Sequence, residues 1–307
     1  MPKMHVDKSI LIRKAPKDLY AVLTDFNHWS AWSPWLIVEK DVTLNVSEDG
    51  KYYEWSGDLV GAGNMKITSE KSNKQIDIDL TFLKPWKSKA KIILTLEKEG
   101  DYTCMHWIMD SSLPFFMFFM KKIMSTYIGM DFERGLSMLK DYIEEGEVLS
   151  KLNFPGVSEY KGCEYIAIKT TCTIDDLGET MQNDFEQMMK FMEDKRDLMS
   201  AEAVSIYHKW NPVKNSVTYS AALPVSKVPD DLPENFVVGT IPATKVYKVE
   251  HEGPYRHIGN AWSAQFSRER AKKFKKNKRI DPFEVYLNSP KDTPEKELRS
   301  DVCFPVL

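Results

Sequence analysis

Cysteine pairs, clustered histidines and long apolar runs are all scarce in this chain of 307 residues. The four cysteines lie far apart without a CxxC pair, and the six histidines show no HxxxH spacing, so no disulfide framework or zinc site is indicated. The longest apolar run, Leu113 to Met120, ends at Lys121, far short of the ~20 residues that span a bilayer. We therefore expect no metal, no cofactor and no membrane span.

An export signal and a strong charge of one sign are absent as well. The first residues carry charges where a secretory signal needs an unbroken apolar core, and the isolated cysteines suit a reducing compartment, so we expect a cytoplasmic protein. The 42 Lys and Arg against 45 Asp and Glu give a net charge of -3, and the basic run at residues 268–279 fits a solvated helix end. We expect no nucleic-acid partner.

The composition is that of an ordinary globular protein, with 42% hydrophobic and 28% charged residues, which argues against disorder and coiled coil. Because compact domains usually hold ~100–200 residues, the length favours two domains. A stretch that mixes polar, proline and glycine residues separates them. We expect one domain at 1–148, a linker at 149–161 and a second domain at 162–307.

The first half has the pattern of an α+β fold. Residues 4–13 alternate like a strand, and an apolar helical pattern with proline in its first turn covers residues 16–28. Residues 39–110 have period two, broken by turn signals, which predicts about six antiparallel strands. Residues 114–145 return to a helical period. We expect a helix-grip antiparallel sheet with a long C-terminal helix, an arrangement that can enclose an apolar cavity.

Several separated motifs within residues 3–146 make this expectation more specific. They are Asp25-Phe26-x-x-Trp29-x-x-Trp32-Ser33-Pro34-Trp35, Trp55-x-Gly57, Gly61-x-Gly63-x-Met65, Trp107 and Ile128-Gly129-x-Asp131-Phe132-x-x-Gly135-Leu136. Together they resemble the polyketide cyclase/dehydrase group of the START-like superfamily. The resemblance implies the fold but no single function, because that superfamily includes cyclases, lipid carriers, hormone receptors and chaperone cofactors.

Aromatic residues are the candidates for lining the cavity of this first domain. From the sheet we expect Tyr53, Trp55, Phe82 and Trp107 to line it. Trp29, Trp32 and Trp35 recur every three residues after the first helix. They are expected to plug the corner between helix and sheet rather than to rim the cavity.

The second half repeats one order of elements. The pattern predicts a strand at 164–173, a helix at 178–198 and strands at 203–210 and 216–223, then a strand at 243–250, a helix at 255–274 and strands at 283–287 and 299–306. This is a duplicated β-α-β-β domain. Two such units related by a pseudo-twofold axis would set their sheets together and leave a central ligand cleft.

Three segments of this half carry a second resemblance. They are His251-Glu252-Gly253-Pro254-Tyr255 at a strand-to-helix junction, Pro282-Phe283-Glu284-Val285-Tyr286-Leu287, and Glu297-Leu298-Arg299-Ser300-Asp301-Val302-Cys303-Phe304-Pro305-Val306. Over about residues 160–307 they resemble the GyrI-like small-molecule-binding family. That family includes effector domains fused to DNA-binding helix-turn-helix modules, gyrase inhibitors, and a subgroup that hydrolyses strained cyclopropane-containing compounds. Here the START-like domain takes the place of the DNA-binding module, and no helix-turn-helix pattern occurs elsewhere.

Glu284 is the first candidate for ligand contact. It alternates with Phe283 and Val285, so its carboxylate and the phenol of Tyr286 share the face opposite the apolar one. On spacing alone, a solvated strand glutamate is the favoured interpretation. The GyrI-like resemblance reverses that preference, because it implies a buried glutamate at this position that attracts cationic aromatic ligands.

Further aromatic candidates accompany Glu284. Tyr255 follows a Gly-Pro turn, and Trp262, seven residues later, shares its helix face; packing is the alternative role for both. Tyr165, Tyr207 and Tyr219 are strand aromatics that can stack on a flat cation, without a signal for which of them faces the cleft. The apolar stripe of the preceding predicted helix is expected in the core, as Met181, Phe185, Met188, Met189 and Met192.

These observations favour one function and leave two alternatives. The leading hypothesis is a protein that senses or sequesters an apolar or cationic aromatic small molecule, with Glu284 at the base of the cleft. The first alternative is a hydrolase with Glu284 as general base and Tyr255 or Tyr286 donating to the leaving group. The second is a regulatory protein that docks a protein partner through the START-like half.

Overall fold

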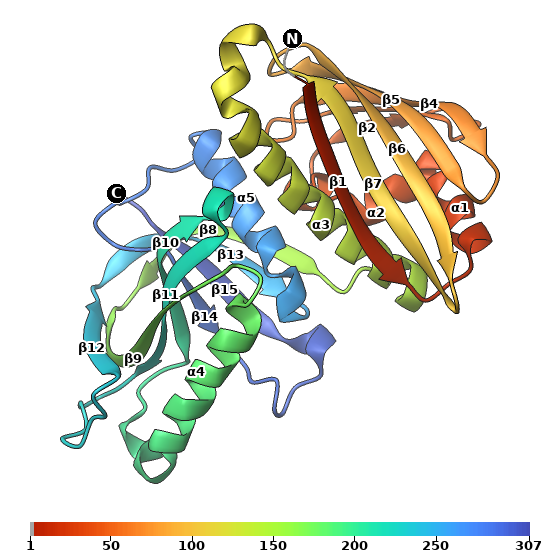
Figure 1. Ribbon diagram of the computed structural model, residues 1–307. Helices are drawn as coiled ribbons and strands as arrows, with labels where there is room; N and C mark the ends of the chain where they lie inside the picture. The colour runs from red at the N-terminus through yellow and green to blue at the C-terminus, as the bar shows by residue number, and fades with distance from the viewer. Residues whose placement is uncertain (1–2) are drawn as a thin grey trace. The chain divides into compact units, whose positions relative to one another are not determined.

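The structure, a computed structural model, describes residues 3–307 (Figure 1). The chain divides into two compact units, Met1–Ser150 and Lys151–Leu307, which we call the N-terminal unit and the C-terminal unit. Each unit is built on its own antiparallel sheet with helices. The predicted α+β class is confirmed.

The N-terminal unit is a seven-stranded sheet closed by one long helix, as the sequence pattern predicts. The strand order is β1-β7-β6-β5-β4-β3-β2. The strands are β1 (Lys3–Ile12), β2 (Thr43–Val46), β3 (Tyr52–Ser56), β4 (Ala62–Lys71), β5 (Gln75–Lys84), β6 (Ser88–Glu99) and β7 (Tyr102–Ser112). Helices α1 (Pro16–Leu23) and α2 (Trp29–Trp32) lie between β1 and β2 in the sequence, and the long helix is α3 (Lys121–Glu145).

The core of this unit lies between the sheet and α3. Trp107 of β7 stacks on Phe132 of α3 with ring centroids 4.3 Å apart, and Trp29 meets Trp107 edge-on at 5.5 Å. Gly135 of α3 permits this approach, because a Cβ atom there would lie 2.8 Å from the Trp107 ring and 3.1 Å from Pro34. The aromatic core therefore requires a helix residue without a side chain.

Two helices of this unit are shorter than the pattern predicts. The first ends at Leu23, and a 3-10 turn, Phe26–His28, follows. There the Asp25 carboxylate accepts a hydrogen bond of 2.9 Å from the backbone N–H of Asn27, a local contact that competes with continued helix. The long helix starts at Lys121, because the residues before it form the 3-10 helix η3 (Phe115–Met120).

The C-terminal unit is an eight-stranded sheet with two helices. The strand order is β12-β9-β11-β10-β14-β15-β13-β8. The strands are β8 (Lys151–Tyr160), β9 (Cys163–Cys172), β10 (Val204–Asn211), β11 (Ser216–Pro224), β12 (Phe236–Ile241), β13 (Thr244–Glu252), β14 (Phe283–Tyr286) and β15 (Arg299–Pro305). The helices are α4 (Leu177–Phe191) and α5 (Gly259–Arg270), the latter preceded by the 3-10 turn η6 (Tyr255–His257).

The strand order is symmetric about the central β10–β14 pair, as a duplication requires. The repeat is longer than predicted, since β8-β9-α4-β10-β11 is followed by β12-β13-α5-β14-β15. The first strand of each repeat pairs with the second strand of the other: β8 with β13, and β12 with β9. The two halves form one continuous sheet, and each half contributes an edge strand to the other.

Residues 149–161, expected to be a linker, contain strand β8. Its Pro155 lies where the pairing with β13 shifts register, between Lys248 and Glu250. Because β8 is an edge strand, a missing backbone N–H at such a bulge is tolerated. The mixture of polar, proline and glycine residues thus marks a bulged edge strand rather than a linker.

The contact between Gly135 and Trp107 predicts a substitution effect. Gly135→Ala should lower the free energy of unfolding by about 1–2 kcal/mol, because overpacking against rigid rings outweighs the gain of ~1 kcal/mol in helix propensity. Gly129→Ala in the same helix is the control, since a Cβ atom there would meet only the movable end of Lys8 at 3.0 Å. Urea denaturation followed by tryptophan fluorescence measures both variants. Equal stabilities would contradict this account of the core.

Candidate functional site

Glu284 lies at the centre of the C-terminal sheet, where the two repeats meet. Three residue pairs join β10 to β14, and Ser205 with Glu284 is the middle one. The Glu284 side chain is 2% exposed. It lies on the sheet face opposite Phe283, as the alternation of β14 predicts.

Three hydrogen-bond donors meet the Glu284 carboxylate. Trp262 Nε1 on α5 donates to Oε1 over 2.5 Å, and the Tyr286 hydroxyl donates to Oε2 over 2.6 Å. The Tyr207 hydroxyl on β10 also hydrogen-bonds to the carboxylate. All three donors are neutral, and no Lys, Arg or His within residues 3–307 forms an ion pair with Glu284. The site therefore buries one acid without a counter-charge.

Burial raises the pKa of Glu284, and the hydrogen bonds from Tyr286, Trp262 and Tyr207 offset only part of that rise. Burial, together with the nearby Glu284 charge, raises the pKa of Tyr207 and of Tyr286 as well. Both phenols consequently remain protonated donors. A cation placed beside this carboxyl group would favour its ionised form.

Partly exposed aromatic rings cover the buried carboxylate. The Trp262 ring meets Tyr207 edge-on at 4.8 Å, and Tyr255 of η6 meets Tyr286 at 5.4 Å. From α4, Phe185 meets Tyr286 at 5.8 Å. The arrangement has an acidic floor and apolar, π-rich walls that come from both helices. Such a site can bind a flat cation through charge and ring contact.

Two residues predicted to contact a ligand do not reach this carboxylate. Tyr219 pairs with Tyr207 across β11 and β10 but is fully buried, and its hydroxyl donates to Asp184 Oδ2 of α4 over 2.6 Å. Tyr165 lies on the opposite sheet face, in the cluster around Phe283. The even-numbered residues of β9 pack with Tyr219. Tyr165 is odd-numbered, so its side chain lies on the other face of the sheet.

Two buried polar residues escaped the sequence analysis, Ser205 within the Glu284 site and Asp184 outside it. Ser205 is fully buried, with its Oγ 2.9 Å from the Tyr286 hydroxyl and 3.2 Å from Met181 Sδ. Only the register of β10 with β14 reveals it. Asp184 had a readable signal, because it follows Met181 by three residues and therefore falls on the apolar face of α4.

The four aromatic residues predicted to line a cavity in the N-terminal unit belong to its core or pack against it. Trp107 is stacked on Phe132, as described above. Tyr53 stacks on Trp55 at 5.7 Å, and Trp55 meets Phe82 edge-on at 6.1 Å. Their contact with a ligand stays a prediction.

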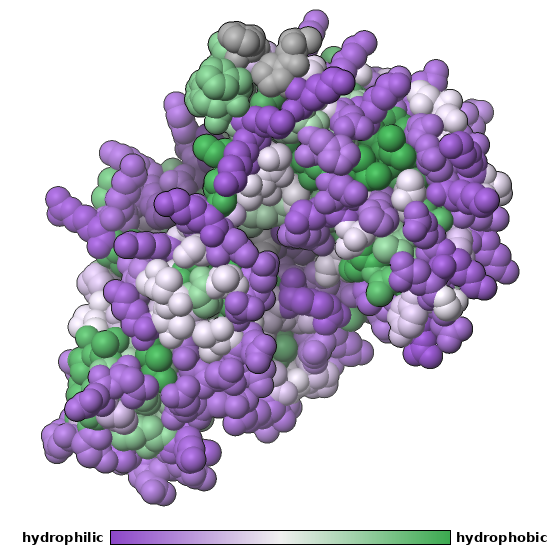
Figure 2. All heavy atoms as spheres, viewed as in Figure 1, coloured by the Kyte–Doolittle hydropathy of each residue, from purple (hydrophilic) through white to green (hydrophobic). Residues whose placement is uncertain are grey.

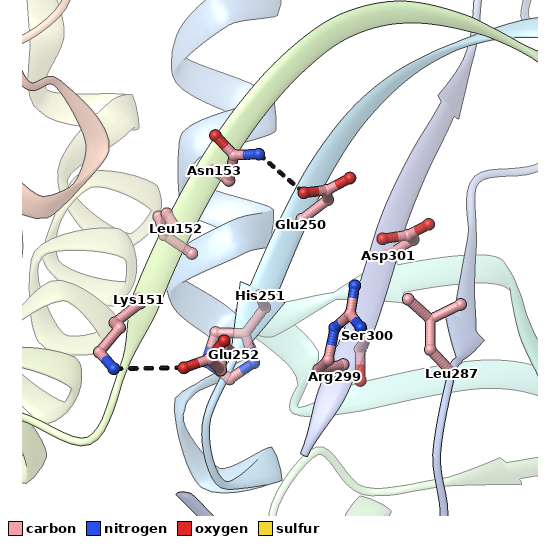
Figure 3. A pocket seen from close by; sticks show the side chains of 10 residues that line it. All are labelled: Lys151, Leu152, Asn153, Glu250, His251, Glu252, Leu287, Arg299, Ser300 and Asp301. Atoms are coloured by element: carbon pink, nitrogen blue, oxygen red, sulfur yellow. Dashed lines mark hydrogen bonds and ion pairs between the residues drawn. The ribbon is translucent and has the colours of Figure 1, made fainter. Parts of the chain in front are cut away.

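A cavity of about 320 Å³ lies at one end of the C-terminal sheet, and Glu284 is not among its lining residues (Figure 3). Figure 3 shows Lys151 joined to Glu252, and Asn153 joined to Glu250, at its wall. Arg299, Ser300 and Asp301 of β15 complete much of the lining. Each of the three carboxylates in this cavity, on Glu250, Glu252 and Asp301, already pairs with a lysine. We therefore take the Glu284 group, which holds an unbalanced buried acid, as the candidate site.

Two searches concern metal and membrane features of the described part of the chain. Residues 3–307 contain no cluster of three or more potential metal ligands. No helix among them is long and apolar enough to cross a membrane. The expectation that the protein needs no cofactor stays a prediction.

Comparison with family models assigns both halves of the chain. Residues 157–307 match the GyrI-like small molecule binding domain, and residues 3–144 match the family described as polyketide cyclase / dehydrase and lipid transport. The chain joins a polyketide cyclase-like domain to a GyrI-like domain. Both resemblances inferred from motifs are confirmed. The Glu284 site lies wholly within the GyrI-like, small-molecule-binding domain.

Solved structures are similar at low identity. The crystal structure of the EcmrR C-terminal domain is 16% identical, covers 52% of this chain and 98% of its own, and gives a TM-score of 0.44. A cryo-EM structure of an EcmrR–DNA complex is 16% identical, covers 63% of this chain and 72% of its own, and gives a TM-score of 0.44. The solution structure of the Aha1 dimer from Colwellia psychrerythraea is 19% identical, covers 46% of this chain and 97% of its own, and gives a TM-score of 0.35.

These TM-scores are too low to carry an argument about what the chain binds. The expected absence of a nucleic-acid partner therefore stays a prediction. Among curated proteins, none matches the chain.

The raised pKa of Glu284 predicts a pH dependence of stability. As pH rises above the ordinary value of 4.5, the unfolded chain releases this proton before the folded chain does, so the folded state loses stability up to the folded-state pKa. Glu284→Gln removes this loss. The stability of the variant relative to wild type should therefore increase from pH 4.5 upward and stay level below it.

Urea denaturation at a series of pH values tests this expectation. Glu234→Gln, which replaces an exposed carboxylate of the same unit, is the control for the substitution itself. A difference between Glu284→Gln and wild type that does not change with pH would show that Glu284 titrates alike in the folded and unfolded chains.

Proposed function

We propose that the GyrI-like domain binds a cationic aromatic small molecule, with the Glu284 carboxylate as the anchor for its positive charge. The single observation that carries this proposal is the buried Glu284, held by neutral donors under partly exposed aromatic rings. Desolvating an acid without a cation is unfavourable. A cationic ligand supplies the missing charge and recovers that free energy as affinity.

The aromatic walls support the choice of a flat, apolar cation. Rings of Trp262, Tyr207, Tyr255 and Tyr286 attract a cation through their π-faces and bury the apolar part of the guest. A small, strongly hydrated cation gains less, because it loses more hydration on entry. Aromatic cations are therefore preferred over inorganic ions or simple amines.

Ligand entry requires a change at Trp262. Its Nε1 donates to Glu284 at 2.5 Å, so the indole occupies one approach to the carboxylate. We propose that the ligand cation replaces this neutral hydrogen bond, since an ion pair in a buried site is stronger than a neutral donor. The indole then becomes a wall against the bound ring system.

A thermal-shift measurement with cationic dyes tests the proposal. At a hundred times the dissociation constant, a ligand stabilises the folded state by ~2.7 kcal/mol, which raises the melting temperature by roughly 5–10 °C for a domain of this size. We expect this shift for wild type and its loss in Glu284→Gln. Asp184→Asn is the matched control, because Asp184 is a second buried acid that accepts from a tyrosine without touching the Trp262 indole.

The ligand recovered after the measurement separates binding from hydrolysis. Mass spectrometry should return the dye unchanged. A hydrolysed dye, with turnover lost in Glu284→Gln, would replace the binding proposal with Glu284 acting as a general base. Equal shifts in wild type and Glu284→Gln would show that the cation is bound elsewhere.

A further inference from the structure

Exposed apolar side chains gather at one end of the polyketide cyclase-like domain. Phe116, Phe118 and Phe119 of η3 are 74%, 60% and 67% exposed, and Ile123 and Tyr127 of α3 are 44% and 50% exposed. Figure 2 shows green side chains at the surface where Figure 1 draws this yellow segment. Single exposed apolar residues are ordinary, whereas a contiguous group marks an interaction surface.

The segment that contains η3 has both a side that contacts the core and a side with exposed aromatic rings. Leu113, just before η3, is 5% exposed, and Met117 packs against the core of the domain. The segment therefore already has an inward face. The rings of Phe118 and Phe119 contact each other at 6.0 Å on the outside. Phe116, Phe118 and Phe119 thus remain largely exposed to solvent.

A second exposed apolar pair lies at the same end of the sheet. Strand β6 pairs with β7 through Ala90 and Ser111, so the β5–β6 turn lies next to the chain that enters η3. Leu83 at the end of β5 and Trp86 in this turn are 43% and 54% exposed. Two neighbouring connections thus present apolar side chains to solvent together.

The two chain segments that carry these rings are basic. Residues 80–96 and 111–130 contain no Asp or Glu. Within the described chain, no ion pair forms at the exposed lysines in or beside these two connections, which are Lys84, Lys87, Lys89, Lys121 and Lys122. Projecting aromatic rings beside uncompensated cations match the interface of a bilayer with anionic headgroups, where rings lie at headgroup level and lysines reach the phosphates.

We propose that this end of the domain docks on membranes that contain anionic lipids. We name it the Phe-Lys surface and define it by Leu83, Trp86, Phe116, Phe118 and Phe119 with the five lysines given above. The rings enter the interface, and the lysines hold the headgroups, without any segment crossing the bilayer. A fluid bilayer accommodates projecting rings by deforming around them, whereas a protein partner must supply a pocket for each anchor.

Vesicle co-sedimentation of the full chain tests this proposal. Wild type should sediment with vesicles of phosphatidylcholine and phosphatidylglycerol, much less with phosphatidylcholine alone, and less as salt increases. The triple variant Phe116→Ser/Phe118→Ser/Phe119→Ser should bind at least about tenfold more weakly. Lys121→Gln/Lys122→Gln should lose roughly fivefold per lysine. Tyr102→Ser removes a 41% exposed aromatic residue from the opposite end of β7 and should bind like wild type.

Three results with vesicles would overturn the proposal. They are no binding to the anionic vesicles, equal binding to both vesicle types, or full binding by the triple Phe variant. Sedimentation velocity without lipid tests whether a second copy of the chain binds this surface instead. A concentration-dependent dimer that the triple variant abolishes would assign the Phe-Lys surface to a second copy of the chain instead.

Discussion

A carboxylate that is held away from water needs donors around it, and the structure of the GyrI-like domain depends on how it supplies them to Glu284. The acid lies at the central pair of an eight-stranded sheet, and its donors come from a strand of each repeat and from α5. Neutral donors keep the acid folded into the sheet without cancelling its charge. That residual charge is what the site offers to a ligand.

The duplication explains why the site is where it is. Because the strand order is symmetric about β10 and β14, residues near that axis are flanked by α4 and α5 alike. Glu284 in one repeat stands opposite Ser205 in the other. The two halves have the same architecture, but only one of the two central positions carries a charge. The exchanged edge strands β8 and β12 tie the halves into one sheet and so fix this pair.

Much of this site is predictable from local periodicity. Alternation in β14 places Glu284 beside Tyr286. The predicted helix that would set Tyr255 and Trp262 on one face starts only at Gly259, and Tyr255 lies before it in η6. Tyr165 and Tyr219 show where local patterns fail. Their surroundings depend on strand register and on which helix covers which strand, and neither is contained in the spacing of one segment. Strand β8 was hidden because Pro155 and Gly156 resemble a linker, and a bulge at an edge tolerates both.

In the polyketide cyclase-like domain, too, local periodicity predicts some features and misses others. Its curved sheet and long helix follow from periodicity, but the Phe-rich segment before α3, which the pattern includes in that helix, forms η3 instead. Leu113 and Met117 make the contacts with the core beside it, whereas Phe116, Phe118 and Phe119 are exposed. Burial depends on available volume as well as on hydrophobicity, and volume is known only when the neighbouring elements are placed.

The central claim is that the Glu284 carboxylate receives the charge of a ligand. A crystal structure of the full chain with a cationic aromatic dye tests it most directly. The account predicts a cationic atom within ~4–6 Å of the Glu284 carboxylate, with the Trp262 indole turned away from Oε1 and stacked on the dye. A dye bound in the cavity beside Arg299, or against the tryptophans of the other domain, with the Trp262–Glu284 hydrogen bond intact, would contradict it.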